Sequence, residues 1–466
     1  MINIPQLSYL MMTLLTTTAD QLACATGFVR RASPLSGSRF ARILVFSWWQ
    51  DPAATCEARA DMAHALGCPV SAQAIDKRFT PRCAAFLRAL LAQAVQMAVK
   101  AEVKADPVGV PVLQRFTSVE ICDSSVVCLP SSLSEEWAGC GHATEAQTAA
   151  LKLTVRFDLS SGKLHGPLLT AARTHDRRAA SQLAQELDPL PVGGLHIGDL
   201  AFFSLEQFSA WDRQGCYWLS RLKGGVVVAG CDGERWDLPS WLGVHCSQVA
   251  QGVQTPILLG ATQCLPARLI AQRVSAGAAK KRRTEMEVEA KREGRVVSAH
   301  EWALADWTLL VTNCLPYQLS VEEALALEGG RWQIELLFKR WKSLGQIDEW
   351  RTHNPWRILC EVYAKLLIMV LQHWLVIAGS WHMAERSLWR GVKVVQRRGQ
   401  ALASAWVRGR REWLGQLAET VGAVGRCRID KRKTQPSTYQ LLLTAPPPIL
   451  LPLPSPLTLY VLPLVA

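Results

Sequence analysis

The stretch Arg331-Trp-Gln-Ile-Glu335-Leu-Leu-Phe-Lys339-Arg-Trp-Lys342 is the most informative part of this chain. At 100° per residue, Glu335 lies about 40° and Lys342 about 20° around a helix from Arg331. One stripe of the helix therefore presents an acid between two bases. The apolar residues that can anchor this helix to a core are Ile334, Leu337, Phe338 and Trp341. The alternative interpretation is a surface helix on which Arg331 and Glu335 form an ordinary i,i+4 ion pair.

Two aspartates lie upstream, where runs of β-forming residues stop. Asp123 follows the run 116–122, and Asp199 follows the run 194–197. Because strand ends are where sites form in open sheets, these aspartates and Glu335 predict a three-carboxylate site. Such a site suits two Mg²⁺ ions, which can activate an attacking oxygen and stabilise the leaving oxygen of a phosphodiester. Taken alone, each aspartate is more typical of a turn.

The segment 112–223 has the element order of a mixed sheet. In chain order we expect three strands at 116–122, 149–157 and 167–173, then a helix at 179–187, a strand at 194–197, a helix at 204–214 and a strand at 216–222. The order β-β-β-α-β-α-β predicts a sheet with helices on its faces. This places the chain in the α/β class.

Residues 1–106 are predicted to form a helical N-terminal DNA-binding region, followed by a Pro/Gly-bounded linker. Within it, helices at 56–66 and 72–79 form a helix-turn-helix pattern, and Ser71 is placed to cap the second helix. The second helix carries polar and basic residues suited to the DNA major groove, namely Gln73, Lys77 and Arg78. An ordinary helical hairpin explains the same pattern.

The rest of the chain is divided by changes in composition. The predicted segments are a β-rich insertion at 224–306, a second core part at 307–350 with a long capped helix at 320–345, a C-terminal helical region at 351–444 and a Pro-rich tail at 445–466. The apolar run 365–381 contains Gln372 and His373 and is short for a membrane span, so we expect a buried helix. No membrane association is expected.

Composition narrows the class of protein. The 466 residues are 49% hydrophobic and include 18 Trp, which excludes a disordered chain. A net charge of +12 fits either a polyanionic partner such as nucleic acid or a merely basic enzyme. The 14 cysteines form no C-x2-C pair, so structural zinc is not expected. They are interpreted as free thiols in a reducing cytoplasm, and no disulfides are expected. The zinc-protease, P-loop and nucleophile-elbow motifs are absent from the sequence.

At these residues the chain resembles the DDE transposases of bacterial insertion sequences, in the insertion-sequence-four group. That group carries the signature Tyr-x2-Arg-x3-Glu-x6-Lys, and Arg331, Glu335 and Lys342 match its last three members. The other matching stretches are 119–125 around Asp123, 198–202 around Asp199, 307–313, 27–31 and 431–433. The resemblance spans roughly residues 20–440 and implies a ribonuclease-H-like core with an insertion between the second Asp and the Glu.

The resemblance also implies roles for single residues. Asp123, Asp199 and Glu335 would hold two Mg²⁺ ions, for which Mn²⁺ substitutes in the family. The residues that would contact double-stranded DNA are Arg331, Lys339, Lys342 and Trp307, the last by stacking on a flipped base unless it is a buried strand residue. The implied reaction is hydrolysis at the terminal inverted repeats and attack of the 3′-hydroxyl on target DNA, by a nucleoid-associated cytoplasmic homodimer. A standalone nuclease and a decayed DNA-binding relative are the alternatives.

Two features complicate this interpretation. Glu328 occupies the Tyr position of the signature, where its charge would repel a phosphate, unless a local shift at Gly329 and Gly330 moves it aside. The basic run 280–283, with further bases up to Arg295, fits either a DNA backbone or an exposed helix that pairs its charges internally.

Overall fold

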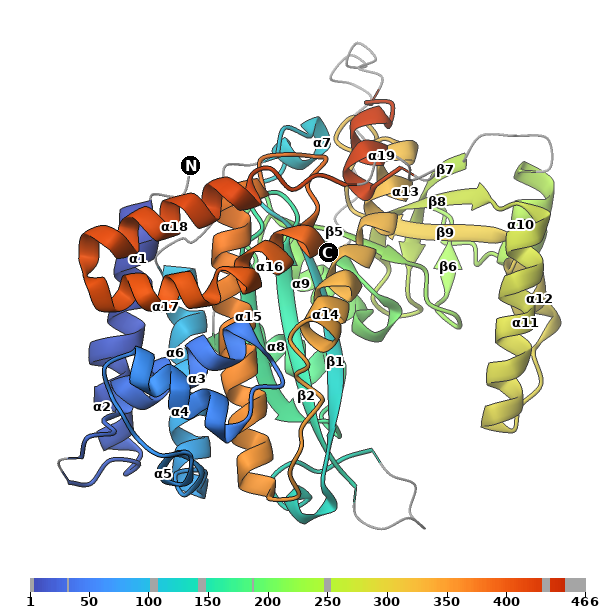
Figure 1. The fold of residues 1–466 in the computed structure, drawn as a ribbon. Coiled ribbons are helices and arrows are strands. Elements are labelled where there is room, and N and C mark those ends of the chain that lie inside the picture. The colour runs from blue at the N-terminus through green and yellow to red at the C-terminus, as the bar shows by residue number, and fades with distance from the viewer. Residues whose placement is uncertain are drawn as a thin grey trace. The chain divides into compact units, whose positions relative to one another are not determined.

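The computed structural model describes residues 4–31, 33–100, 108–140, 148–186, 188–246, 253–429 and 436–448 (Figure 1). The chain divides into two compact units. The first comprises Met1–Gln114, Ser118–Leu190 and Trp332–Ser437, and the second comprises Arg115–Thr117, Pro191–Arg331 and Thr438–Ala466. All 14 cysteines are free thiols. The basic stretch 431–433 and most of the Pro-rich tail lie outside the described residues.

The first unit begins with the helices expected from the sequence. They are α1 (Ile4–Thr13), a π-turn at Leu14–Thr18, α2 (Ala19–Ala25), α3 (Gly37–Gln50), α4 (Cys56–Ala65), α5 (Ala72–Asp76) and α6 (Pro81–Lys100). Ser71 caps α5 as predicted, since its side chain accepts a hydrogen bond from the backbone N–H of Ala74. At five residues, α5 is shorter than predicted, and Lys77 and Arg78 lie just after it.

A three-stranded antiparallel meander follows in the same unit. Its strands are β1 (Val119–Leu129), β2 (Ala149–Asp158) and β3 (Leu164–Ala171), preceded by the short helix α7 (Pro111–Gln114) and followed by α8 (Asp176–Glu186). The prediction that Asp123 ends the first strand is wrong, because β1 continues to Leu129 and pairs with β2 from Glu120 to Leu129. The Asp-Ser turn preference is overridden by this ladder and by the β-forming residues that follow.

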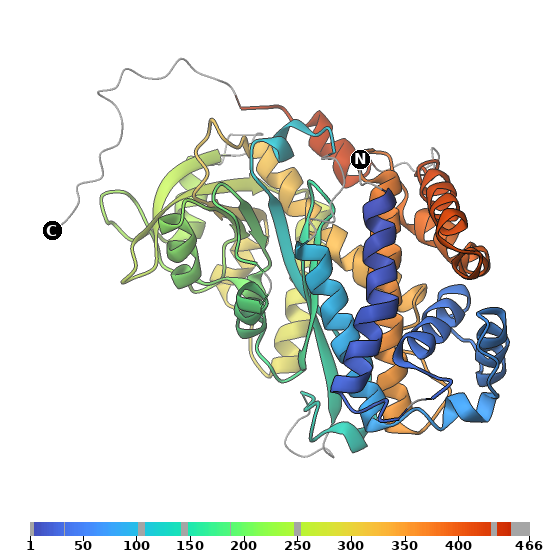
Figure 2. The same cartoon turned by 90° about the vertical axis from the view of Figure 1, so that its left-hand side faces the viewer.

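Helices of the C-terminal half complete the first unit. They are α14 (Trp332–Ser343), α15 (Pro355–Ser380), α16 (Leu388–Arg397), α17 (Gly399–Arg408) and α18 (Arg410–Val424). Among the described residues, α15 alone is long and apolar enough to cross a membrane, but its most apolar window is completely buried inside the unit. Helices α3, α6, α16 and α18 pack around it, and Figure 2 shows the blue N-terminal helices alongside orange α15. The predicted buried helix is confirmed.

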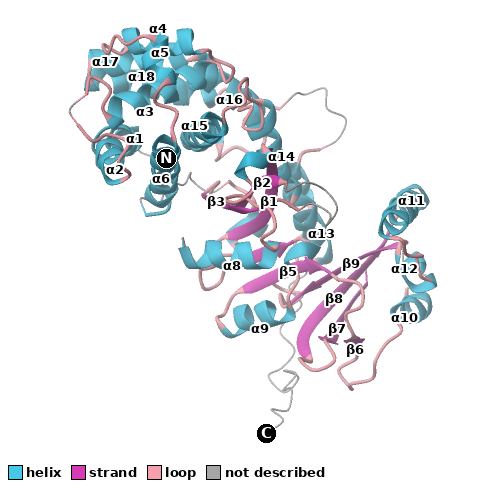
Figure 3. Ribbon diagram, turned by 90° about the horizontal axis from the view of Figure 1, so that it is seen from below, coloured by secondary structure: helices cyan, strands magenta, loops and turns pink. Residues whose placement is uncertain are grey.

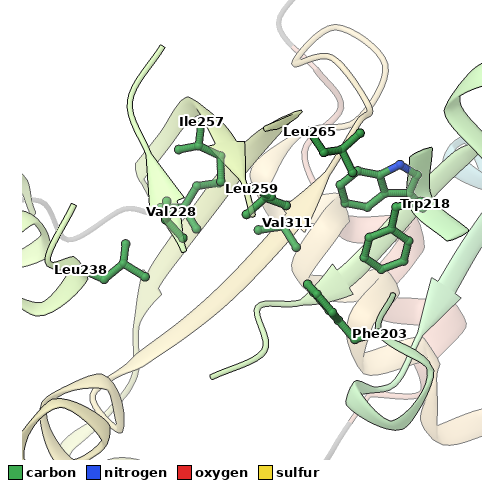
Figure 4. Close-up of a cluster of buried hydrophobic side chains, with 10 residues drawn as sticks. Phe203, Trp218, Val228, Leu238, Ile257, Leu259, Leu265 and Val311 are labelled. Atoms are coloured by element: carbon green, nitrogen blue, oxygen red, sulfur yellow. The ribbon is translucent and has the colours of Figure 1, made fainter. Parts of the chain in front are cut away.

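The described part of the second unit contains six strands. The strands β4 (Leu195–Gly198) and β5 (Tyr217–Arg221) are parallel, and the others are antiparallel in the order β5-β9-β8-β7-β6: β9 (Trp307–Thr312), β8 (Leu265–Arg273), β7 (Val253–Leu259) and β6 (Val228–Ala229). A buried cluster that includes Phe203, Trp218, Leu259 and Val311 fills its core (Figure 4).

The helices of the second unit change two expectations. They are α9 (Leu205–Arg213), α10 (Leu238–His245), α11 (Ala276–Glu293), α12 (Ala299–Leu304), α13 (Val321–Gly330) and α19 (Thr438–Thr444), with a 3₁₀ turn at Leu200–Phe202. The described part of 224–306 holds three strands and three helices, so it is mixed rather than β-rich. Figure 3 shows α10, α11 and α12 gathered at one end of β8 and β9.

The long helix predicted at 320–345 is two helices that meet at Arg331. The capping box at Ser320 and Glu323 begins α13 as predicted. Gly329 and Gly330 then weaken the helix, since glycine has a low helix propensity. The N–H of Arg331 donates to the carbonyl of Glu328, three residues back, at 3.1 Å. The second helix, α14, starts at Trp332.

Candidate functional site

Asp123 lies in the middle of β1 and is half-buried. Its Oδ1 accepts a hydrogen bond of 2.8 Å from the backbone N–H of Ser124. The hydroxyl of Ser124 donates to Asp176 Oδ1 at 2.7 Å, and Lys152 Nζ donates to the same carboxylate at 2.9 Å. Lys152 also donates to the carbonyl of Thr174 at 2.6 Å. Asp123 is thus followed by a network that ties β1, β2 and the start of α8 together.

The charge of Asp176 is stabilised by this network. Burial raises the pKa of Asp176, but the hydrogen bonds from Lys152 and Ser124 outweigh burial and hold the pKa below its usual value. The side chains of Lys152 and Asp176 are 9% and 28% exposed, so the pair is partly shielded from water. The sequence analysis did not identify either residue, because nothing local links positions 24 residues apart.

Glu335 lies on α14, in the same unit as Asp123. Helix α14 buries its apolar face as predicted, with Ile334, Leu337, Phe338 and Trp341 inside and Glu335 half-buried. The helix packs against β1, and Lys342 Nζ donates to the carbonyl of Val126 at 3.0 Å. The structure therefore brings the helix of Glu335 into contact with the strand of Asp123. Lys339 is exposed on the same helix.

Asp199 lies in the second unit, directly after β4, as predicted. Its Oδ1 accepts a hydrogen bond of 2.8 Å from the N–H of Leu200, the same arrangement that holds Asp123. Arg331 Nη1 lies 3.8 Å from Asp199 Oδ2, and the two side chains are 17% and 33% exposed. The structure places Arg331 beside a carboxylate that sequence spacing alone did not assign to it.

The three predicted acids supply oxygen donors, which are the ligands that Mg²⁺ and Mn²⁺ prefer. In both aspartates one oxygen is oriented by the next backbone N–H, which fixes the carboxylate without neutralising it. Among the residues that the structure describes, no three His, Cys, Asp or Glu side chains form a ready-made metal cluster.

The comparisons with known proteins bear on all of these residues. The Transposase DDE domain family matches residues 114–371, more than half of the chain, and this range contains Asp123, Asp199 and Glu335. The chain belongs to the DDE transposases. It is 28% identical over 368 residues to the transposase for insertion sequence element IS231F of Bacillus thuringiensis subsp. israelensis, covering 76% of each chain. It is 20% identical over 380 residues to the transposase for insertion sequence element IS1151 of Clostridium perfringens, covering 78% of each.

These findings establish a DNA transposase of an insertion sequence, an enzyme that acts on DNA. In this transposase the departure at the signature Tyr position is compensated. Glu328 Oε1 lies 2.7 Å from Arg221 Nε, and the glutamate side chain is only 15% exposed. The acid expected to repel a phosphate is therefore paired with a base at the end of β5.

Trp307 of the transposase is half-buried at the start of β9. It packs against the small buried cluster of Leu242, Cys246 and Ala271, and the Arg273 guanidinium lies 6.0 Å from its ring centroid. This arrangement favours the interpretation as a packed strand residue. Trp332, which the sequence analysis passed over, is 55% exposed and directly follows Arg331. A helical wheel identifies it, since it lies about 160° from buried Ile334.

The basic run at 280–283 lies in α11, and four of the six basic side chains of this helix have an acidic or backbone partner: Lys281, Arg282, Arg283 and Arg292. Arg282 donates to Trp307 O and Thr308 Oγ1, and Arg283 pairs with Asp306 at 2.7 Å. Exposed pairs join Lys281 to Glu285, Arg292 to Glu289 and Arg295 to Glu293 and Glu301. The structure favours an exposed helix with partly paired charges over a DNA-binding surface at α11.

Proposed function

We propose that this transposase moves its element by a cut-and-paste reaction in which Asp123, Asp199 and Glu335 bind two divalent metal ions. One observation carries the proposal: the matched family range contains all three acids, and α14, which carries Glu335, packs on β1, which carries Asp123. Asp199 is included in the proposed site because it directly follows β4 and its carboxylate accepts a hydrogen bond from the next backbone N–H. Mg²⁺ is the proposed ion, and Mn²⁺ is expected to replace it.

When bound, the metal ions would activate the attacking oxygen and stabilise the leaving oxygen of the phosphodiester. The basic side chains around the acids hold the DNA. Arg331 and Lys342 are proposed to contact phosphates next to the scissile bond. Exposed Lys339 is proposed to contact a phosphate further along the same DNA. Exposed Trp332 offers a ring on which a base can stack, and half-buried Trp307 at the start of β9 is the second candidate.

We propose a ribonuclease-H-like core made of 112–223 and 307–350, interrupted by the mixed insertion 224–306. Its support is the element order β1-β2-β3-α8-β4-α9-β5, which follows the predicted β-β-β-α-β-α-β. The helices of 1–106, including the α4–α5 pair, are proposed to bind DNA, and 351–444 to support the core. A homodimer acting on paired element ends in the bacterial cytoplasm completes the proposal, because two ends must be cut and joined together.

The test uses duplexes that carry the terminal inverted repeat, with Mg²⁺ and a target plasmid. The variants Asp123→Asn, Asp199→Asn and Glu335→Gln should each abolish cleavage and joining while end binding persists. The matched control is Glu287→Gln on exposed α11. Unchanged cleavage in any of the three variants would remove that residue from the site.

The same assay separates transposition from the alternatives. A transposase cuts at the repeats and joins the ends to target DNA, whereas a nuclease cuts DNA without repeats and joins nothing. Tight end binding without cleavage by the wild type in Mg²⁺ or Mn²⁺ would identify a decayed relative instead.

A further inference from the structure

The segment from Arg386 to Arg411 is the most basic part of the described chain. It contains eight Lys or Arg residues and no Asp or Glu, so it carries two thirds of the chain's net charge of +12. This distinguishes it from α11, which contains four acidic residues, three of which pair with nearby bases. A helix without acidic residues of its own keeps its positive field facing the solvent.

Helix α16 arranges these charges on one side. Its buried residues are Leu388, Gly391, Val392 and Val395. The exposed bases Arg390, Lys393 and Arg397 lie within a sector of about 60° on the opposite side. Trp389, 37% exposed, borders this sector, and Lys393 Nζ lies 5.5 Å from its ring centroid. We call these four residues the α16 basic face.

The α16 basic face is held next to the signature helix. Gln396 Nε2 donates to the carbonyl of Leu344, just after α14, at 2.9 Å. Leu388 and Val392 of α16 border the same small cavity as Leu337 and Trp341 of α14. The α16 basic face therefore belongs to the same unit as exposed Lys339, on a neighbouring helix.

A second basic segment runs beside the start of α16. The N–H of Ser387 donates to the carbonyl of Cys427 at 3.0 Å, and Arg390 Nη1 donates to the carbonyl of Arg428 at 3.0 Å. The exposed side chains of Arg426 and Arg428 are thus fixed near the α16 basic face. The positive surface is formed by two segments rather than by one helix.

The spacing of the bases suits a nucleic-acid backbone. Arg390 and Arg397 are seven residues apart, or about 10 Å along the helix axis. Phosphates of one DNA strand follow one another every 3.4 Å along the duplex axis, so three bases over about 10 Å can reach separate phosphates. Contacts of Arg and Lys with phosphate oxygens carry no sequence information, and we therefore expect binding independent of sequence.

We propose that the α16 basic face, with Arg426 and Arg428, binds the phosphate backbone of double-stranded DNA and extends the contacts made around the signature helix. The proposal rests on the chain's action on DNA and is independent of which acids bind metal. It adds a binding surface beyond the residues of the proposed catalytic site. The face sets affinity and its salt dependence, and it leaves sequence recognition to other elements.

The test measures binding of the full chain to fluorescent duplexes in EDTA, so that cleavage plays no part. The triple variant Arg390→Gln, Lys393→Gln and Arg397→Gln should lower the slope of log K against log salt by about 2–3. The dissociation constant at low salt should rise about tenfold or more, equally for duplexes with and without the terminal repeat. The double variant Lys393→Gln and Arg397→Gln, which keeps the Arg390 contact to Arg428, should lower the slope by about 2.

The matched control removes three charges from α11 by Lys280→Gln, Lys281→Gln and Lys291→Gln, and should change the slope by less than one. Charge-preserving Arg390→Lys and Arg397→Lys should keep the wild-type slope. Equal losses in the α11 control and the triple variant would reduce the effect to net charge and overturn the proposal. An unchanged slope in the double variant would overturn the proposal as well. So would a triple variant that no longer binds anionic vesicles but binds DNA as the wild type does.

Discussion

Removal of the Lys152 ammonium group should weaken the strand that carries Asp123. Lys152 and Asp176 are 9% and 28% exposed, and their contact is 2.9 Å. A hydrogen bond to a charged, partly buried group contributes about 1.5–3 kcal/mol, so Lys152→Met should cost about 2–3 kcal/mol because it leaves the carboxylate with fewer partners. Asp176→Asn should cost about 1–2 kcal/mol, since the amide still accepts a hydrogen bond. The double variant should show a coupling energy of about 1–2 kcal/mol.

The chain has two compact units, so a local measurement tests this prediction most directly. Hydrogen exchange of peptides from β1 and β2 reports the opening free energy of this region. Because the folded pKa of Asp176 lies below its ordinary value, its contribution is complete above that ordinary value and is lost as the pH falls through the folded one. The difference between wild type and Asp176→Asn should therefore shrink in acid.

The same substitution should affect catalysis through Asp123. Residues that orient a metal ligand typically change affinity or activity by 10- to 100-fold, so Lys152→Met should slow cleavage by about tenfold and raise the Mg²⁺ requirement. A coupling energy below about 0.3 kcal/mol would refute the network. Normal cleavage by Lys152→Met would show that the network does not reach Asp123.

Three further predictions follow from individual contacts. Arg221→Gln should destabilise the second unit by about 1–2 kcal/mol and weaken end binding, and adding Glu328→Gln should restore both, as thermal melting and end-binding assays would show. Burial raises the pKa of Glu120 to about 7, so the free energy of unfolding should fall as the pH rises toward 7 and then level off. In Glu120→Gln the free energy of unfolding, measured with urea, should change less across that range. Gly162→Ala should lower the free energy of unfolding, measured by melting, by about 2–4 kcal/mol, because φ is +74° and an added Cβ would lie 2.6 Å from the indole ring of Trp381. Gly67→Ala, where an added Cβ meets open space, should lower it by about 1–2 kcal/mol.

The sequence predicted the local elements well where the pattern was strong. Strand β4 ends before Asp199 and the capping box starts α13 as expected, because both signals are local. Strand β1 passes Asp123 because pairing with β2 overrides a turn dipeptide. The break at Arg331 follows from two glycines whose effect a periodicity argument does not weigh.

Long-range partners were beyond sequence reasoning. Arg221 lies 107 positions before Glu328, and nothing in the spacing links the base to the acid at the signature Tyr position. Lys152 and Asp176 depend on strand register and on where α8 begins. The charges of α11 were visible in the sequence, but the contacts of Arg282 with Trp307 and of Arg283 with Asp306 depend on how the chain returns after the helix.

The central claim is that Asp123, Asp199 and Glu335 share a pair of metal ions. Replacing Mg²⁺ with Fe²⁺ and adding ascorbate and peroxide produces radicals that cut the backbone beside the bound metal. We expect cuts near all three residues in the DNA-bound protein, suppressed by excess Mg²⁺ and lost together in Glu335→Gln. Cuts near only one of them, or cuts near Asp123 that persist in Glu335→Gln, would contradict a shared site.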